Sequence, residues 1–203
     1  MRGVFHPRHT LPPRVREFGY VPDLNQLRPG DLVLFSAVKP RRRSRAIVRS
    51  QRDAGHHEAD ARWHHAAVYV GDSEICEAVV WRGVHLASLY DSVETHLLRF
   101  RRDPRLTDHD SWRVAVNALR FLRRRYGLAA LFRIWQQTRL GFWRPDIRHK
   151  KLRARICSEL YADAYTLTTG RMLMRGTLNI LTPAELSVTA ALADIQVDWL
   201  QIA

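Results

Sequence analysis

Apolar and polar residues alternate with a strand-like period in the first half of this chain of 203 residues. In "HAAVYVG", residues 65–71, the alternation places His65, Ala67 and Tyr69 on one face of a strand. A Gly-Asp-Ser turn and two further apolar stretches follow, which predicts an antiparallel meander over residues 64–89. Upstream, a Pro-Gly pair leads into the apolar stretch 27–38 and predicts another strand.

Helical spacing governs the second half of the chain. Counting from Cys157, the residues at i+3, i+4, i+7 and i+8 form one apolar helix face, namely Leu160, Tyr161, Ala164 and Tyr165. Cys157 is therefore expected on the buried side of the first turn, with Ser158, Glu159 and Asp163 turned elsewhere. "LTPAELS", residues 181–187, predicts a turn or helix that begins with proline.

An earlier helix is expected after a cap at Asp110 or Ser111. Gly127 is its expected stop, and its inward stripe consists of Ala115, Ala118, Leu119, Leu122 and Tyr126. The apolar and aromatic segment 128–143 predicts a second helix or a packed lid.

The remaining segments read as irregular. Residues 1–26 are rich in proline, and residues 39–62 are polar and basic, which predicts an exposed loop. There are no internal repeats, and the length fits a single domain over residues 1–203.

Composition narrows the class of protein. Hydrophobic residues at 46% and charged residues at 26% are typical of a soluble globular chain. No segment has the apolar core of a signal peptide or the length of a membrane span, so we expect a cytoplasmic protein with reduced thiols. Two cysteines cannot form a disulfide framework, and no Cys/His cluster has zinc-ligand spacing, so neither a metal nor a cofactor is expected.

The charge balance is strongly basic, with 33 Lys and Arg against 20 Asp and Glu and a net charge of +13. Arginines cluster in residues 40–52, 97–105 and 119–127. Such an excess suits a nucleic acid or an anionic membrane surface as partner. Since no ribonucleoprotein motif or clear helix-turn-helix accompanies the clusters, a solvated basic face is the favoured interpretation.

Cys157 supports two interpretations. A free cysteine is usually a small buried residue that fills a core. A thiol at a helix N-terminus, however, meets unpaired N–H groups and the positive end of the dipole, which favour the thiolate. The helix pattern alone does not choose between a packing residue and a nucleophile.

A nucleophilic cysteine needs a base and a third group that orients the base. If Gly71, Asp72 and Ser73 form a three-residue loop, Val70 pairs with Glu74, and Glu77 lies opposite Ala67 on the same face as His65. A loop of even length would turn Glu77 to the other face. The alternatives are an exposed His65 at a strand edge and a solvent-side Glu77.

The order of several short motifs resembles a known family. "GDLVLFSA", "HHAAVYVG", "EAV", an alanine-rich helix, "ICSELYADAY" and "LTPAELS" together resemble the permuted NlpC-type, papain-like cysteine hydrolases of the YiiX-like group. The resemblance covers residues 27–187. It implies an α+β, circularly permuted papain-like fold, with an antiparallel sheet or half-barrel packed against helices and the nucleophile at a helix N-terminus.

The resemblance also implies roles for individual residues. Cys157 would be the nucleophile, His65 the general base and Glu77 the orienting group. The family histidine directly precedes the apolar strand, which selects His65 over His64, while Cys76 matches no family nucleophile and is expected to be a packing residue.

The implied activity is that of a cysteine-dependent hydrolase or acyltransferase. It would act through an acyl-enzyme on an amide, ester or thioester, and its substrate would be an acyl-containing small molecule, a peptide or a lipid. The alternative is a catalytically inactive papain-like module whose basic surface binds nucleic acid or anionic lipid.

Overall fold

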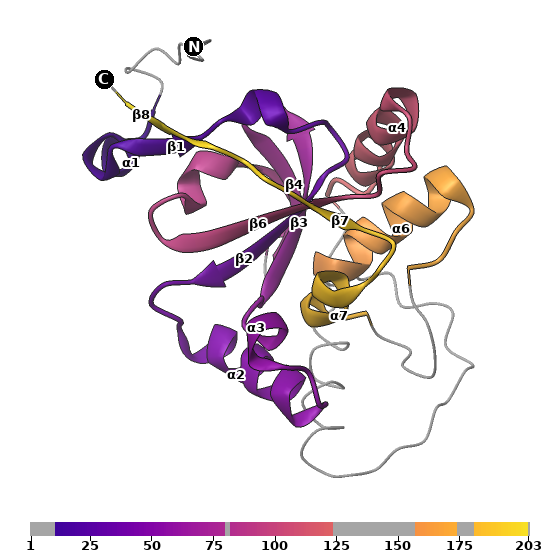
Figure 1. Cartoon of the computed structure of the whole chain (residues 1–203), viewed down its shortest axis with the longest axis horizontal. Coiled ribbons are helices and arrows are strands. Elements are labelled where there is room, and N and C mark those ends of the chain that lie inside the picture. The colour runs from indigo at the N-terminus through magenta and orange to yellow at the C-terminus, as the bar shows by residue number, and fades with distance from the viewer. Residues whose placement is uncertain (1–10, 80–81, 124–156, 174–180, 203) are drawn as a thin grey trace.

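The computed structural model describes residues 11–79, 82–123, 157–173 and 181–202. Its centre is a six-stranded antiparallel sheet of order β5-β4-β3-β2-β6-β7 (Figure 1). The strands are β2 (Leu32–Ala37), β3 (His65–Gly71), β4 (Glu74–Val79), β5 (Gly83–Ser88), β6 (His96–Arg102) and β7 (Ala193–Ile195). The antiparallel meander predicted from the alternation is formed by β3, β4 and β5, and β2 is the strand predicted after the Pro-Gly turn.

Helices α4 (Asp108–Leu119), α6 (Cys157–Thr169) and α7 (Pro183–Val188) lie together beside the sheet (Figure 1). They share one apolar core with the sheet face that carries Leu34 and Val68. Among the described residues, Tyr161 and Tyr165 of α6 are the largest fully buried side chains, and they fill this core. The helical spacing therefore predicted the packed face of α6 correctly.

The opposite sheet face is covered by short elements from the two ends of the described chain and by η3 (Leu89–Ser92). These are α1 (Pro13–Phe18), β1 (Tyr20–Pro22), η2 (Leu24–Gln26) and β8 (Trp199–Gln201). β1 and β8 pair antiparallel as a separate two-stranded sheet. Val33, Phe35 and Ala67 belong to this second core, so the sheet is buried on both faces.

Two segments expected to be irregular are helical. Residues 39–62 contain α2 (Arg42–Asp53) and α3 (Glu58–Ala61), so the prediction of a loop there was wrong, although most of α2 is exposed. Arginine and alanine are good helix formers, and the high charge of the segment concealed this preference. The expected irregular region 1–26 includes α1, whose first residue is Pro13, because proline is tolerated at the start of a helix.

Two local details of the predicted helices also differ. The cap of α4 is Thr107, whose hydroxyl accepts from the Asp110 N–H, rather than Asp110 or Ser111. Ser158 does not face outward: it is fully buried and donates to the Leu181 carbonyl at 2.5 Å. In the expected stripe Ala115 and Ala118 are buried and Leu119 and Leu122 pack against the core, whereas Tyr126, Gly127 and segment 128–143 lie outside the described residues.

The sequence interpretation did not anticipate β6. Its sequence, "HLLRFRR", overlaps the arginine cluster at residues 97–105. Arg99 and Arg101 of this strand form ion pairs with Asp194, which lies on the neighbouring β7. Among the described helices, none has the length and apolar character needed to cross a membrane.

Candidate active site

The position of Glu77 depends on a β-bulge. The β3–β4 turn has only two residues, Asp72 and Ser73, both with positive φ, and Gly71 pairs with Glu74. This two-residue turn corrects the expected pairing of Val70 with Glu74. A regular ladder from such a turn would place Glu77 opposite Val68, on the helix-covered face.

The register shifts between Tyr69 and Gly71, so that Tyr69 pairs with Ile75 and Ala67 pairs with Glu77. The extra residue of the bulge restores the alternation that the even-length turn would have reversed. Glu77 therefore lies opposite Ala67, as predicted, and diagonal to His65 on the same face.

The Glu77 carboxylate is directly bonded to the His65 imidazole. Oε2 of Glu77 lies 2.6 Å from Nε2 of His65, and the two side chains are 15% and 21% exposed. Burial by itself would raise the pKa of Glu77. The hydrogen bond and charge of His65, with the charges of His85 and Arg82, outweigh burial and lower that pKa.

Cys157 is the first residue of α6 and is almost fully buried. Burial by itself would lower the pKa of His65. The charge and hydrogen bond of Cys157, together with those of Glu77, overcome burial and raise the pKa of His65 to about 10. The imidazole of His65 thus interacts with both the sulfur and the carboxylate, and the structure brings the three predicted side chains together. Since Nε2 of His65 faces Glu77, Nδ1 is the ring nitrogen left for the sulfur.

His64, the adjacent histidine, has different partners. Its Nε2 accepts a hydrogen bond from the Ala37 N–H at 3.2 Å, and its ring packs edge-on against His96. Burial, with the charges of His65 and His96, lowers the pKa of His64 to about 4. His64 is therefore a neutral, buried hydrogen-bond acceptor.

Cys76 lies in the core with no exposed surface, and its sulfur is 3.6 Å from the Ala118 carbonyl. Burial, reinforced by the charge of Glu77, raises the pKa of Cys76 to about 12. Such a thiol is poorly reactive near neutral pH. Cys76 is a packing residue, in agreement with the sequence interpretation.

Sequence reasoning missed one residue of this cluster. His85, on β5, is the direct cross-strand partner of Glu77, and its Nε2 lies 3.3 Å from Glu77 Oε1. The predicted meander already contained the signal, because the strand after Glu77 must pair with it. Extending the register argument by one hairpin would have identified His85.

Comparison with known proteins supports the fold. No family model and no curated protein matches the sequence. The structure is similar to that of the metalloprotein YiiX from Escherichia coli O157:H7, with a TM-score of 0.59, 16% sequence identity, and coverage of 86% of this chain and 99% of that one. The chain therefore has a YiiX-like α+β fold. In the described part of the chain, no group of three or more His, Cys, Asp or Glu side chains is arranged to hold a metal ion.

Proposed function

We propose that this protein is a cysteine-dependent hydrolase or acyltransferase with a permuted papain-like arrangement, in which Cys157 is the nucleophile, His65 the general base and Glu77 the orienting group. The observation that carries the proposal is the double contact of His65, to the Cys157 sulfur and to the Glu77 carboxylate. A nucleophile, a base and an orienting group in this order are the requirements of nucleophilic catalysis.

The chemistry follows from the proton positions. His65 holds the proton taken from Cys157, and the thiolate attacks the substrate carbonyl to form a carbon–sulfur bond. His65 gives its proton to the leaving group as the bond to that group breaks. His65 then removes a proton from water or from another acceptor. The water or acceptor attacks the thioester carbonyl, the carbon–sulfur bond breaks, and Cys157 is released.

The start of α6 supplies hydrogen-bond donors for the oxyanion that forms during the reaction. The first N–H groups of a helix have no partner within the helix, so the backbone at Cys157 and Ser158 is suited to stabilise the oxyanion. The buried hydrogen bond from Ser158 to Leu181 fixes this first turn against the α7 segment. The same arrangement serves amides, esters and thioesters, and we propose an acyl-containing small molecule, peptide or lipid as substrate.

Selective alkylation tests the proposal. The native protein is treated with iodoacetamide at pH 7, and the rates at Cys157 and Cys76 are measured by peptide mass spectrometry. We expect Cys157 to react about 100-fold faster, because it contacts the His65 imidazole at the first turn of α6 while the Cys76 thiol is buried with a raised pKa. The His65→Ala variant should lose most of this preference, whereas His64→Gln should keep it.

A second measurement detects the acyl-enzyme directly. A short acyl thioester is added, and the intact mass of the protein is recorded for an acyl adduct on Cys157, with Cys76→Ser as the matched control. Equal, slow alkylation of both cysteines, with no acyl adduct, would reject the enzyme in favour of a binding module.

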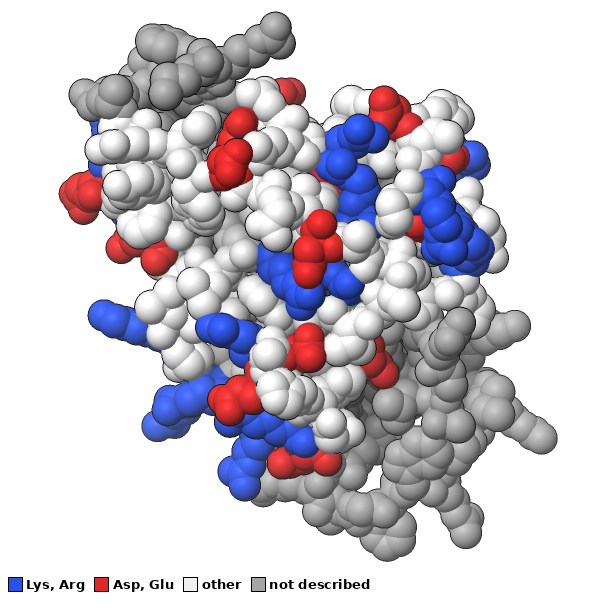
Figure 2. Space-filling model, in the orientation of Figure 1, with Lys and Arg blue, Asp and Glu red and all other residues white. Residues whose placement is uncertain are grey.

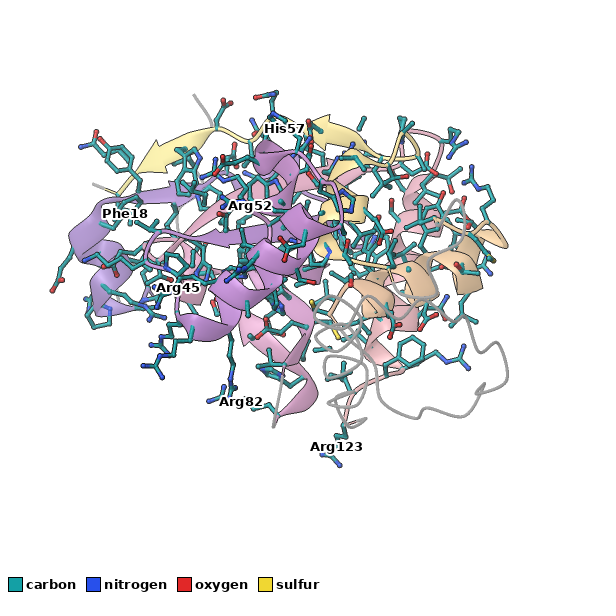
Figure 3. The ribbon with its side chains drawn as sticks, turned by 90° about the horizontal axis from the view of Figure 1, so that it is seen from below. Phe18, Arg45, Arg52, His57, Arg82 and Arg123 are labelled. Atoms are coloured by element: carbon teal, nitrogen blue, oxygen red, sulfur yellow. The ribbon has the colours of Figure 1, made fainter. Side chains whose placement is uncertain are left out.

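Binding of a polyanion is a second candidate function, and helix α2 favours it. Arg42, Arg43, Arg45 and Arg49 are exposed on this helix, and none of them pairs with an acidic side chain in the described residues. Figure 2 shows basic side chains over the part of the surface where α2 lies, and Figure 3 shows Arg45 on that helix. Buried Gln51 bonds the Ala61 and Trp63 carbonyls and the Ala184 N–H, so the helix is firmly attached.

Salt-dependent binding tests this second function. Binding of a fluorescent DNA duplex and of phosphatidylglycerol vesicles is measured at low and high salt. Replacing Arg42, Arg45 and Arg49 with Gln should weaken binding strongly, while the same change at Arg16, Arg113 and Arg123 should have a smaller effect. Equal losses in the two triple variants would show that net charge, not α2, is responsible.

A further inference from the structure

Both oxygens of the Glu77 carboxylate are engaged by histidines on the neighbouring strands. Oε2 faces Nε2 of His65 on β3, and Oε1 faces Nε2 of His85 on β5. Because β4 lies between β3 and β5 in the sheet, the carboxylate bridges the two imidazoles across three strands. Side chains of Glu77 and His85 are 15% and 22% exposed, so water competes only partly for this contact.

Each ring nitrogen of His85 lies close to an oxygen atom. Its Nδ1 lies 3.2 Å from the Gly83 carbonyl oxygen, and its Nε2 lies 3.3 Å from a carboxylate oxygen. Both neighbours are hydrogen-bond acceptors, so the ring of His85 is held between the Gly83 carbonyl and the Glu77 carboxylate.

The charge of Arg82 also acts on Glu77, but the Arg82 side chain extends away from the protein into solvent (Figure 3). Among the described residues, His85 is therefore the side chain in direct contact with Oε1 of Glu77. Of the other titratable neighbours, Cys157 on α6 acts on His65, and burial together with the charge of His65 in turn lowers the pKa values of His64 and His96. The charge of Glu77 also acts on His96 and on buried Cys76.

We propose that His85 is a positioning residue, which holds Oε1 of Glu77 so that Oε2 stays bonded to Nε2 of His65. A carboxylate held at one oxygen cannot rotate away from the imidazole, and the orientation of His65 toward Cys157 is then fixed through two strands. The consequence at Cys157 rests on the proposed function, whereas the effect on His65 does not.

The pKa of His65, measured by NMR on protein with ¹⁵N-labelled histidine, separates the possible roles. In His85→Phe, or in His85→Ala if the first variant does not fold, a positioning role predicts that this pKa falls by about one pH unit. His85→Gln, which keeps a neutral donor, should recover most of the fall. If His85 acted only through a positive charge, the pKa of His65 would rise in all of these variants. If His85 were a purely structural residue, the pKa of His65 would not change. Either result would overturn the proposal.

Alkylation of Cys157 gives the second readout. Its rate at pH 7 should fall about tenfold in His85→Phe and recover in His85→Gln. Leu86→Ala changes the next residue of β5, whose side chain is exposed, and should leave both readouts unchanged. If wild-type Cys157 shows no selective reactivity, the proposed function fails, while the response of the His65 pKa still decides the role of His85.

Discussion

The Glu77 carboxylate lies 2.6 Å from the His65 imidazole although the two residues face each other diagonally, not directly, across β3 and β4. One bulge near the turn makes this contact possible, because a regular hairpin with the same two-residue turn would place Glu77 on the helix-covered face. The contact couples the sheet to the start of α6 through a single imidazole.

Removing the charge of Glu77 should weaken this coupling. In Glu77→Gln, the pKa of His65 should fall below its wild-type value of about 10, because the amide cannot stabilise the imidazolium as a carboxylate does. NMR titration measures that pKa, and the alkylation rate of Cys157 at pH 7 should fall about tenfold or more. Glu74→Gln, an exposed position on the same strand, should change neither quantity; an unchanged His65 pKa in Glu77→Gln would contradict the assigned interaction.

His64 should make the folded protein less stable in mild acid. Its pKa is about 4 in the folded state and about 6.5 in an unfolded chain, so the unfolded state binds the extra proton between these values. Stability should therefore fall as the pH is lowered from 6.5 to 4, by at most ~3 kcal/mol from this group. Urea unfolding over this pH range should show a weaker dependence in His64→Gln than in the wild type, and parallel curves would rule out the effect.

Asp103 should be a major stabilising residue. Its buried carboxylate accepts from the Tyr165 hydroxyl at 2.5 Å and lies 2.9 Å from Arg105 Nε and 3.1 Å from an Arg171 nitrogen. Burial would raise its pKa, but hydrogen bonds from Arg105 and Tyr165 hold it at about 2. The Asp103 carboxylate therefore stabilises the folded protein above pH 4, and this stabilisation is lost as the pH falls toward 2.

Asp103→Asn should cost about 2 kcal/mol in the free energy of unfolding, since a neutral amide bonds Tyr165 and the partly exposed Arg105 and Arg171 more weakly than the carboxylate does. Asp91→Asn, which breaks the exposed pair with Arg14, should cost less than about 1 kcal/mol. Denaturant midpoints compare the two variants, and equal small costs would show that the Asp103 network contributes little.

Gly30 should not accept a side chain. Its φ is +98°, and a Cβ there would lie 2.2 Å from the Ser111 backbone oxygen, at the start of α4. Gly55 also has a positive φ, of +91°, but a Cβ there would meet nothing within 4 Å. Gly30→Ala should cost well above the ~1–2 kcal/mol of backbone strain expected for Gly55→Ala, because α4 must also move. Thermal unfolding distinguishes them, and similar melting temperatures would contradict the close packing of α4.

Several features were predictable because their physical cause is local. Alternation identified β3, and helical spacing identified the buried face of α6 from Cys157 to Tyr165. The capping box of α7, between Thr182 and Glu185, likewise depends on residues three apart. The helicity of α2 is also local, although the high charge of its segment is equally typical of an exposed loop.

Contacts between segments that lie far apart in the chain could not be predicted from such local patterns. The bulge that turns Glu77 toward His65 leaves no clear mark in the sequence, and the predicted pairing of Glu77 with Ala67 was reached from a loop length that the structure does not have. Likewise, β6 pairs with β2 across more than 50 residues of sequence, and nothing in its arginine-rich pattern specifies that partner.

The sequence by itself determined the alternation of β3 and the apolar face of α6 from Leu160 to Tyr165, since each follows from the geometry of a few consecutive residues. Only the tertiary structure decided that the tip of α6 meets the end of β3, and that Glu77 is shared between His65 and His85. Those contacts depend on strand order, on one bulge and on the packing of both sheet faces, which are properties of the whole chain rather than of any segment.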